Sequence, residues 1–406
     1  MAVLKSLPRI VIALGFVSFL TDVSSEMIYP LLPAFLAGTL ALGPSAALAL
    51  GVIEGVAEAT ASILKLASGL WADRVPRRKP FLLAGYGLAG AARPLIGLAG
   101  SWPAVLALRF LDRVGKGIRS SPRDALIADV TPPDRRGTAY GVHRAMDHAG
   151  AVVGPLVAAG LLAWGGFALD QVFVLAAIPA ALVMVVLALA VQEPAGRVVA
   201  AAPPGRSPLG SLRESWRDCG PEFRRLLLAL GIFTLGNSAD AFLLLRLRDA
   251  GVAAAWIAVL WSLHHVVKMV CTAAGGRLAD RWGPRRMIVA GWIVYALVYA
   301  AFGLVAEPTV LIAVFLAYGM YFGLVEPAEK AWVSRLAPAA WRGTAFGFYH
   351  GVIGLAALPA SVAFGLLWAK LGAPVAFFAG AGLALAAAVL VARVGDAEAG
   401  RAAAAS

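Results

Sequence analysis

The chain has 406 residues, of which 60% are hydrophobic and 14% are charged, and its formal net charge at pH 7 is +12. A soluble protein of this length needs a charged surface, which this composition, with a mean hydropathy of +0.80, does not supply. The basic residues gather in alternate connections between apolar segments, as in the cytoplasmic loops of membrane proteins, so nucleic acid is not expected as a partner. We therefore expect an all-α integral membrane protein embedded in a lipid bilayer.

Apolar runs of about 20 residues, the length that crosses a bilayer, recur along the whole chain. Twelve membrane-spanning helices are predicted, over residues 9–37, 47–72, 80–100, 103–130, 138–164, 170–191, 223–246, 254–277, 286–306, 309–335, 344–370 and 373–393. The stretch between the sixth and the seventh is polar and rich in Pro, Gly and Arg. This pattern predicts an N-terminal bundle over 1–191, a cytoplasmic linker over 192–222 and a C-terminal bundle over 223–406. The basic connections predict that both termini are cytoplasmic, in a bacterial-type inner membrane.

Charges within the predicted helices are the strongest functional signal, because each costs about 2.5–3.5 kcal/mol in hydrocarbon and usually faces the interior of the bundle. Asp22 and Glu26 lie four residues apart on the first helix and therefore share one face. We expect this pair to bind a cation or carry protons, or else to form an ion pair with a basic residue of helix four or five. Glu58 on helix two is a further candidate for the same polar site.

The fourth and fifth predicted helices are dense in charge. Arg113 and Arg119 are candidate cations of a central cavity, where they pair with the acids of helix one or hold an anionic group of a substrate. On helix five, Arg144 has Asp147 three residues away and His148 four residues away, so all three share a face. A histidine beside a carboxylate titrates near neutral pH, which makes this group a candidate proton site. A structural ion pair and ligation of a metal or substrate are the alternatives.

Polar residues also interrupt the helices of the second half. The candidate binding residues there are Asn237 and Asp240 on helix seven, His265 and Lys268 on helix eight, Glu326 on helix ten and His350 on helix eleven. We expect His265 to act together with Lys268, which lies three residues beyond it. Glu326 precedes a proline, which removes one backbone hydrogen bond beside the acid.

Two motifs of the first half recur in the second half at nearly the same distance. Gly-Leu-Trp-Ala-Asp-Arg at 69–74 recurs as Gly-Arg-Leu-Ala-Asp-Arg at 276–281. Arg-Gly-Thr-Ala-Tyr-Gly at 136–141 recurs as Arg-Gly-Thr-Ala-Phe-Gly at 342–347. Each copy falls in a matching predicted cytoplasmic connection, which indicates that the two six-helix halves are duplicated.

These motifs resemble the signature of the major facilitator superfamily, Gly-x-x-x-Asp-Arg-x-Gly-x-Arg-Arg. The copy at 276–286 keeps the central glycine as Gly283, whereas the first copy has Pro76 there. The segment 150–155, Gly-Ala-Val-Val-Gly-Pro, is similar to a motif of the antiporter branch. The resemblance covers essentially the whole chain. It implies two pseudo-symmetric six-helix bundles around a central cavity that opens alternately to each side.

A conformational gate is expected at the cytoplasmic ends of the helices. The resemblance implies that the aspartates of the repeated loop motif tie neighbouring helices together in one conformation. Independently, an Arg-Asp pair on helix four and a Glu-Lys pair on helix ten occupy related positions with exchanged signs, which predicts a gate between the halves. The expected gate residues are Asp73, Arg74, Arg123, Asp124, Asp280, Arg281, Glu329 and Lys330.

The sequence has no nucleotide-binding loop, no Ser-His-Asp constellation and no pair of redox cysteines, so we expect neither an enzyme nor a cofactor. We expect a monomeric secondary active transporter that couples efflux of a small organic or drug-like compound to protons. Transport of metal ions or their chelates and uptake of an organic anion are the alternatives within transport, and their ligands are unknown. A transporter-like membrane sensor is the alternative from another class.

Overall fold

The computed structural model describes residues 7–41, 46–193, 208–238, 240–252 and 254–395. The described first half, up to residue 193, consists of α2 (Arg9–Glu26), α3 (Leu32–Ala34), α4 (Ala46–Asp73), α5 (Lys79–Leu95), α6 (Trp102–Val130), α7 (Arg136–Ala163), α8 (Leu169–Leu175) and α9 (Ala177–Ala190). A short helix, α10 (Pro208–Asp218), follows. The second half, from residue 220, consists of α11 (Gly220–Gly236), α12 (Ala241–Asp249), α13 (Ala254–Trp282), α14 (Pro284–Leu304), α15 (Pro308–Leu336), α16 (Arg342–Leu371) and α17 (Ala373–Ala392).

The surface of this bundle is that of a protein in hydrocarbon. Within the described residues, nine helical segments are long and apolar enough to cross a membrane. Large apolar side chains point outward, among them Leu189, Leu228 and Leu297, each more than 60% exposed. By contrast, α6 buries Arg109, Asp112, Arg119, Arg123 and Asp124. The charges thus lie inside and the apolar groups outside, as expected when lipid is the solvent.

Apart from the seventh, the predicted helices are confirmed, with their ends shifted by up to five residues, but the first is shorter than predicted. Its α-helical part ends at Glu26, and irregular turns at Tyr29–Leu31 and Phe35–Thr39 flank the short α3. Pro30 falls in the first of these turns. A proline cannot donate a backbone hydrogen bond, which weakens the regular helix at this point.

The predicted seventh helix is wrong as a continuous helix, because α11 ends at Gly236 and α12 begins at Ala241. Side chains of α14 bind the groups exposed at this break. The Tyr295 hydroxyl donates to the carbonyl oxygen of Gly236 at 3.0 Å, and the Tyr299 hydroxyl lies 2.9 Å from the Ser238 hydroxyl. The first of these bonds gives a donor to a backbone carbonyl at the end of α11.

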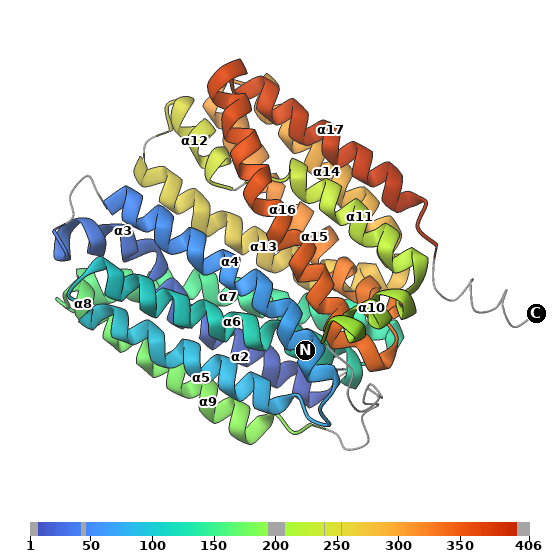
Figure 1. Cartoon of the computed structure of the whole chain (residues 1–406). Coiled ribbons are helices and arrows are strands. Elements are labelled where there is room, and N and C mark those ends of the chain that lie inside the picture. The colour runs from blue at the N-terminus through green and yellow to red at the C-terminus, as the bar shows by residue number, and fades with distance from the viewer. Residues whose placement is uncertain (1–6, 42–45, 194–207, 239, 253, 396–406) are drawn as a thin grey trace, which may run out of the picture.

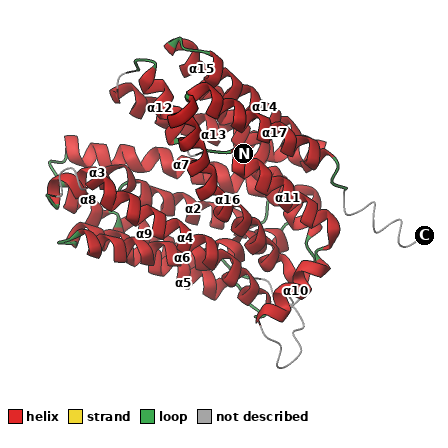
Figure 2. Cartoon of the chain, turned by 45° about the horizontal axis from the view of Figure 1, so that its top comes forward, coloured by secondary structure: helices red, strands yellow, loops and turns green. Residues whose placement is uncertain are grey.

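The two halves meet through two crossed pairs of helices, in which α7 packs along α13 and α4 packs along α16. Figure 1 and Figure 2 show the helices of each half gathered into a bundle, with α10 at the end of the molecule away from α3, α8 and α12. We call the end where α4 and α13 finish and α7 and α16 begin the closed end. The predicted domain boundaries stay a prediction, and residues 194–207 of the predicted linker lie outside the described ranges.

Candidate functional site

A cavity of about 480 Å³ lies between the halves. Helices α2, α4, α5, α6 and α7 of the first half and α11, α15 and α16 of the second half form its wall. Nine Lys and Arg side chains and five Asp and Glu side chains line it. Its volume falls within the range of about 300–1,000 Å³ that is usual for sites of drug-sized ligands.

Most of the predicted binding residues reach this cavity. Those that line it are Asp22, Glu26, Arg113, Arg119, Arg144, Asp147, Asn237, Glu326 and His350. Three residues predicted for the gate, Arg123, Glu329 and Lys330, line it as well. The side chain of Glu58 lies outside the described residues.

The two acids of helix one are brought to the cavity by close packing of α2 against α7. A Cβ atom at Gly150 would lie 2.9 Å from the Cβ atom of Asp22, and one at Gly154 would lie 2.8 Å from that of Glu26. Only glycine allows the two helices to approach so closely. The predicted antiporter-like segment 150–155 therefore has a physical role here, since it holds the acid-bearing face of α2 against α7.

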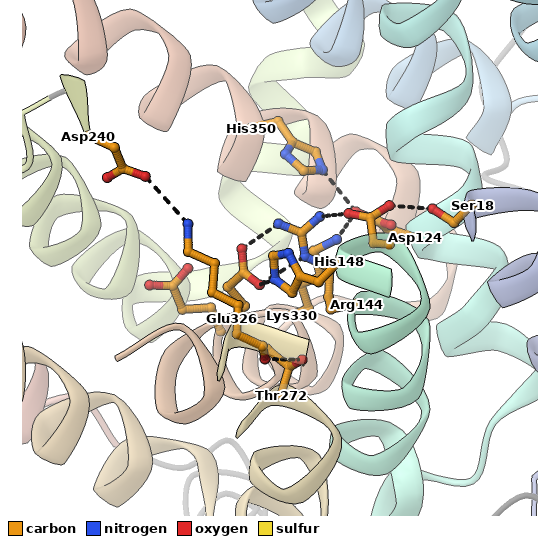
Figure 3. A network of polar contacts seen from close by, with 12 residues as sticks. Ser18, Asp124, Arg144, His148, Asp240, Thr272, Glu326, Lys330 and His350 are labelled. Atoms are coloured by element: carbon orange, nitrogen blue, oxygen red, sulfur yellow. Dashed lines mark hydrogen bonds and ion pairs between the residues drawn. The ribbon is translucent and has the colours of Figure 1, made fainter. Parts of the chain in front are cut away.

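A network of ion pairs joins the halves beside the cavity (Figure 3). Arg144 of α7 pairs with Asp147 on its own helix and, through two nitrogens, with Glu326 of α15 in the opposite half. The Nε2 atom of His148 lies 3.2 Å from Glu326, and the Ser18 hydroxyl of α2 donates to Asp147 at 2.5 Å. The predicted group of Arg144, Asp147 and His148 is thus assembled, with Glu326 as its partner across the interface.

A second network is centred on Asp124, which is fully buried. Its carboxylate lies 2.9 Å from the ammonium nitrogen of Lys330 and 2.9 Å from Nε2 of His350, both in the second half, as Figure 3 shows. Arg123 pairs with the neighbouring Asp124 rather than with Glu329, which accepts a hydrogen bond from the Tyr349 hydroxyl. Of the four predicted gate residues of α6 and α15, Asp124 and Lys330 therefore pair across the interface.

A third polar group lies within the second half, outside the lining of the cavity. Lys268 lies 3.4 Å from the Asp240 carboxylate and 3.6 Å from the centre of the Phe322 ring. The predicted partner of Lys268, His265, instead places Nδ1 3.0 Å from the carbonyl oxygen of Trp261. The rings of His265 and His148 are 6.0 Å apart, so this group approaches the Arg144 network from the other half.

Arg93 of α5 lines the cavity but was missed in the sequence. Its Nε atom donates to Asp112 at 2.7 Å, and Asp112 also accepts from Arg109 at 3.1 Å. Another nitrogen of Arg93 donates to the carbonyl oxygen of Thr21 at 3.0 Å. The signal that could have found this residue is a lone arginine inside the apolar run predicted over 80–100.

At the closed end, each copy of the loop motif binds the start of a helix in the opposite half. The carboxylate of Asp73 accepts hydrogen bonds from the backbone N–H groups of Gly343 and Thr344, at 2.9 and 2.6 Å, near the start of α16. The carboxylate of Asp280 does the same at the start of α7, where the N–H groups of Gly137 and Thr138 donate at 2.7 Å. Free N–H groups and the helix dipole favour an anion at these positions.

The arginines that follow these aspartates behave differently from each other. Arg74 donates to the Ser211 hydroxyl of α10, whereas Arg281 is exposed. The expected role of both in a gate stays a prediction. In the described part of the chain, no group of three or more His, Cys, Asp or Glu side chains is placed to hold a metal ion.

Comparison with known proteins gives consistent matches over most of the chain. A family model described as "Major Facilitator Superfamily" matches residues 14–263 and 225–405. An uncharacterized MFS-type transporter of Methanocaldococcus jannaschii is 31% identical over 387 residues, which is 94% of each chain. The multidrug resistance protein MdtH of Edwardsiella ictaluri is 27% identical over 312 residues, covering 75% of this chain and 73% of that protein. Among solved structures, the human organic anion transporter MFSD10 (TETRAN) is 18% identical, with a TM-score of 0.80 over 94% of this chain and 99% of that one.

Proposed function

Since the chain belongs to the Major Facilitator Superfamily, and is therefore a multi-pass membrane transporter and not an enzyme, we propose that it exports a small organic compound in exchange for protons. We further propose that residues 1–191 and 223–406 are the two bodies that rock about the central cavity, joined by the linker 192–222. The direction of transport rests on the likeness to the multidrug resistance protein MdtH.

The observation that carries the proton coupling is the position of Arg144 between two carboxylates of different halves. Arg144 pairs with Asp147 on α7 and with Glu326 on α15. A proton added to Glu326 removes the charge that holds Arg144, so protonation weakens a bond that joins the halves. In this scheme, protonation of Glu326 directly favours separation of the halves beside the cavity.

His148 and Ser18 position the two carboxylates for this role. His148 of the first half lies 3.2 Å from Glu326. Ser18 donates to Asp147, which stabilises the charged form of that acid while Arg144 is shared. We therefore propose that Glu326 takes up and releases the proton and that Asp147 orients Arg144.

The orientation in the membrane is part of the proposal. The closed end carries a group of arginines. Arg74, Arg77 and Arg78 lie in the connection after α4, and Arg281 and Arg285 lie at the end of α13 and the start of α14. Lys and Arg are retained on the cytoplasmic side of bacterial membranes. We therefore assign the closed end and both termini to the cytoplasm.

The test is a measurement of substrate-driven proton flux in proteoliposomes that contain a pH-sensitive dye. In the wild type, we expect an aromatic probe compound added on one side to cross the membrane and to drive protons across it in the opposite direction. Glu326→Gln should abolish this proton flux while the probe still exchanges across the membrane. Probe movement with no proton flux in the wild type would contradict the coupling, and no probe movement at all would favour the sensor.

Lys370→Gln is the matched control for this experiment, because Lys370 is an exposed residue at the far end of α16, away from the cavity. Its proton flux should equal that of the wild type. The alternative of metal transport predicts another outcome in the same vesicles, namely proton flux driven by a divalent metal ion and none driven by the organic probe.

A further inference from the structure

The two walls of the cavity differ in chemistry. The first half contributes eight cationic side chains and three acids: Lys65, Arg93, Arg109, Arg113, Lys116, Arg119, Arg123 and Arg144, with Asp22, Glu26 and Asp147. The second half contributes seven apolar or aromatic side chains: Leu230, Phe233, Tyr321, Phe322, Val325, Tyr349 and Ile353. Its polar and charged residues at the cavity are Thr234, Asn237, Glu326, Glu329, Lys330 and His350. One wall is therefore basic, whereas about half of the other is apolar or aromatic.

Some of the cations of this wall have counter-ions behind it. Asp112 pairs with Arg93 and Arg109, and Asp124 pairs with Arg123. With these two acids included, the described residues of the first half place five carboxylates beside these eight cations. A wall on which cations outnumber acids among the described residues favours an anion in the cavity.

Arg119 is the residue of this wall that is built to receive such an anion. It is 5% exposed and lines the cavity, and its guanidinium lies 4.2 Å from the centre of the Tyr86 ring. Its Nε and Nη1 atoms are buried and have no hydrogen-bond partner. Burying an N–H donor without a partner costs free energy, which an oxyanion that accepts a hydrogen bond from the Arg119 guanidinium reduces.

The basic residues of α6 continue the site along the helix. Arg109, Arg113, Lys116, Arg119 and Arg123 recur at spacings of three and four, so they follow one stripe of α6 beside the cavity. The planar fork of arginine fits carboxylate, sulfonate and phosphate groups better than the compact ammonium of lysine does. An oxyanion at Arg119 therefore lies beside a stripe of five basic residues.

We propose that the transported compound is an amphipathic organic anion whose oxyanion head is bound by Arg119 and the α6 stripe, and whose apolar or aromatic body packs against the second-half wall. This inference rests on the proposed function, because it takes the central cavity to be the transport site. A substrate of this shape touches both halves at once. The contacts of its head with one half and of its body with the other thus favour closure of the cavity around it.

The experiment is a calorimetric titration of the purified full chain in detergent, at pH 7 and without any gradient. The probes are 1-naphthalenesulfonate, the neutral 1-naphthalenesulfonamide, the small anion methanesulfonate and the cation (1-naphthylmethyl)trimethylammonium. We expect the naphthalenesulfonate to bind at least tenfold more tightly than each of the other three. Equal binding of the sulfonate and the sulfonamide, tighter binding of the cation, or no binding of the sulfonate would overturn the proposal.

Variants assign the two ends of the probe. Arg119→Gln should weaken binding of the sulfonate at least tenfold and leave binding of the sulfonamide unchanged. Phe322→Ala should weaken both by the same factor, because that ring belongs to the apolar wall. Lys116→Gln, on the same stripe and only half-buried, provides a second test of the head site should Arg119→Gln fold poorly. An unchanged sulfonate affinity in the folded variants of the α6 stripe contradicts the assigned head site.

The outcomes of this measurement distinguish failure of the substrate proposal from failure of the proposed function. Binding is measured without a pH gradient, so selective binding of the sulfonate together with an absence of proton flux contradicts the coupling alone. Proton flux driven by the neutral or the cationic probe, together with weak binding of the sulfonate, contradicts the substrate class alone. Lys370→Gln again serves as the control, with the affinity of the wild type expected for every probe.

Discussion

Asp73 and Asp280 cap helices of the opposite half with the same bonds but in different surroundings. Asp73 is fully buried and pairs at 2.8 Å with Arg78, which is also fully buried. Asp280 is 11% exposed, and its arginine partner, Arg335, lies 3.7 Å away and is 29% exposed. The two copies of one motif have thus become a buried contact and a more solvated one.

The buried contact is also the more extensive. Arg78 reaches Asp129 at 3.4 Å, and Asp129 pairs at 2.7 Å with Arg342, the first residue of α16. A chain of charges therefore runs from α4 to the helix that Asp73 caps. At the other contact, Arg136 at the start of α7 donates to the carbonyl oxygen of Ser334.

The comparison shows which part of the motif the capping depends on. The first copy lacks the central glycine and has Pro76 there, whereas Gly283 in the second copy adopts a φ of +85°. Both aspartates nevertheless make the same three bonds. What the contacts share is the Gly-Thr pair at the start of the capped helix, where a Cβ atom at Gly343 would lie 2.7 Å from an Asp73 carboxylate oxygen. Close approach at this glycine, and not the loop glycine, permits the cap.

The largest effect is expected from Asp73→Asn. The amide retains the shape of the side chain but leaves the buried Arg78 without its nearest carboxylate. Removing one partner of a buried ion pair costs about 3–5 kcal/mol. We expect the closed end to lose about 3 kcal/mol relative to its open form, which is a change of about 100-fold in the population ratio. Spin labels at the exposed positions 77 and 286, in a background without the native cysteines, measure the distance between the halves at the closed end. The distribution of that distance gives the population ratio.

Asp280→Asn is the matched variant, and a smaller effect is expected because the carboxylate is more solvated. The loss of charge weakens hydrogen bonds to three donors, which is worth about 1.5 kcal/mol, or about tenfold in the same population ratio. The same pair of labels measures it. Equal shifts in the two variants would show that burial of Arg78 contributes nothing and would remove the difference between the contacts.

Both contacts illustrate what sequence alone can predict in this protein. The repeated motifs identified Asp73 and Asp280, and the apolar runs identified the helices that carry them. Repetition shows that two segments are related, but it does not show that Asp73 meets the second copy of the Arg-Gly-Thr motif and Asp280 the first. That crossing depends on how α4 packs along α16 and α7 along α13, over distances of more than 130 residues in the chain.

The same limit explains what was missed at the cavity. The break after Gly236 depends on Tyr295, and the position of Arg93 depends on Asp112. Neither partner is near in sequence, so neither contact leaves a local pattern. Arg144, Asp147 and His148 were predictable as a group because one helical face displays them. Their partner Glu326 was predicted as an intramembrane acid, but its contact with Arg144 required the structure.

A difference between the two contacts that the motif does not encode is the presence of α10 beside the first. Arg74 donates to Ser211, and Nε1 of Trp341 donates to Asp218 at 3.1 Å. Trp341→Phe keeps an aromatic six-membered ring and removes this second bond, which is worth about 1 kcal/mol. We expect about a fivefold shift toward the open form with labels at 77 and 286. No shift would show that α10 rests on the closed end without stabilising it.

The smallest effect is expected at Glu307, which caps a helix of its own half in full contact with water. Its carboxylate accepts from the N–H groups of Val310 and Thr309 at 2.7 and 3.0 Å, and these bonds hold its pKa below its ordinary value. A carboxyl group with a lowered pKa in the folded state stabilises the protein above its ordinary pKa, and that contribution is lost as the pH falls through the lowered one. Glu307→Gln should therefore lower the melting temperature slightly at pH 7, and the difference should vanish as the buffer is acidified. A difference that persists in acid would mean that the side chain stabilises α15 by packing and not by its charge. The effects at Asp73, Asp280 and Glu307 could then no longer be compared as those of one kind of carboxylate cap that differs only in its burial.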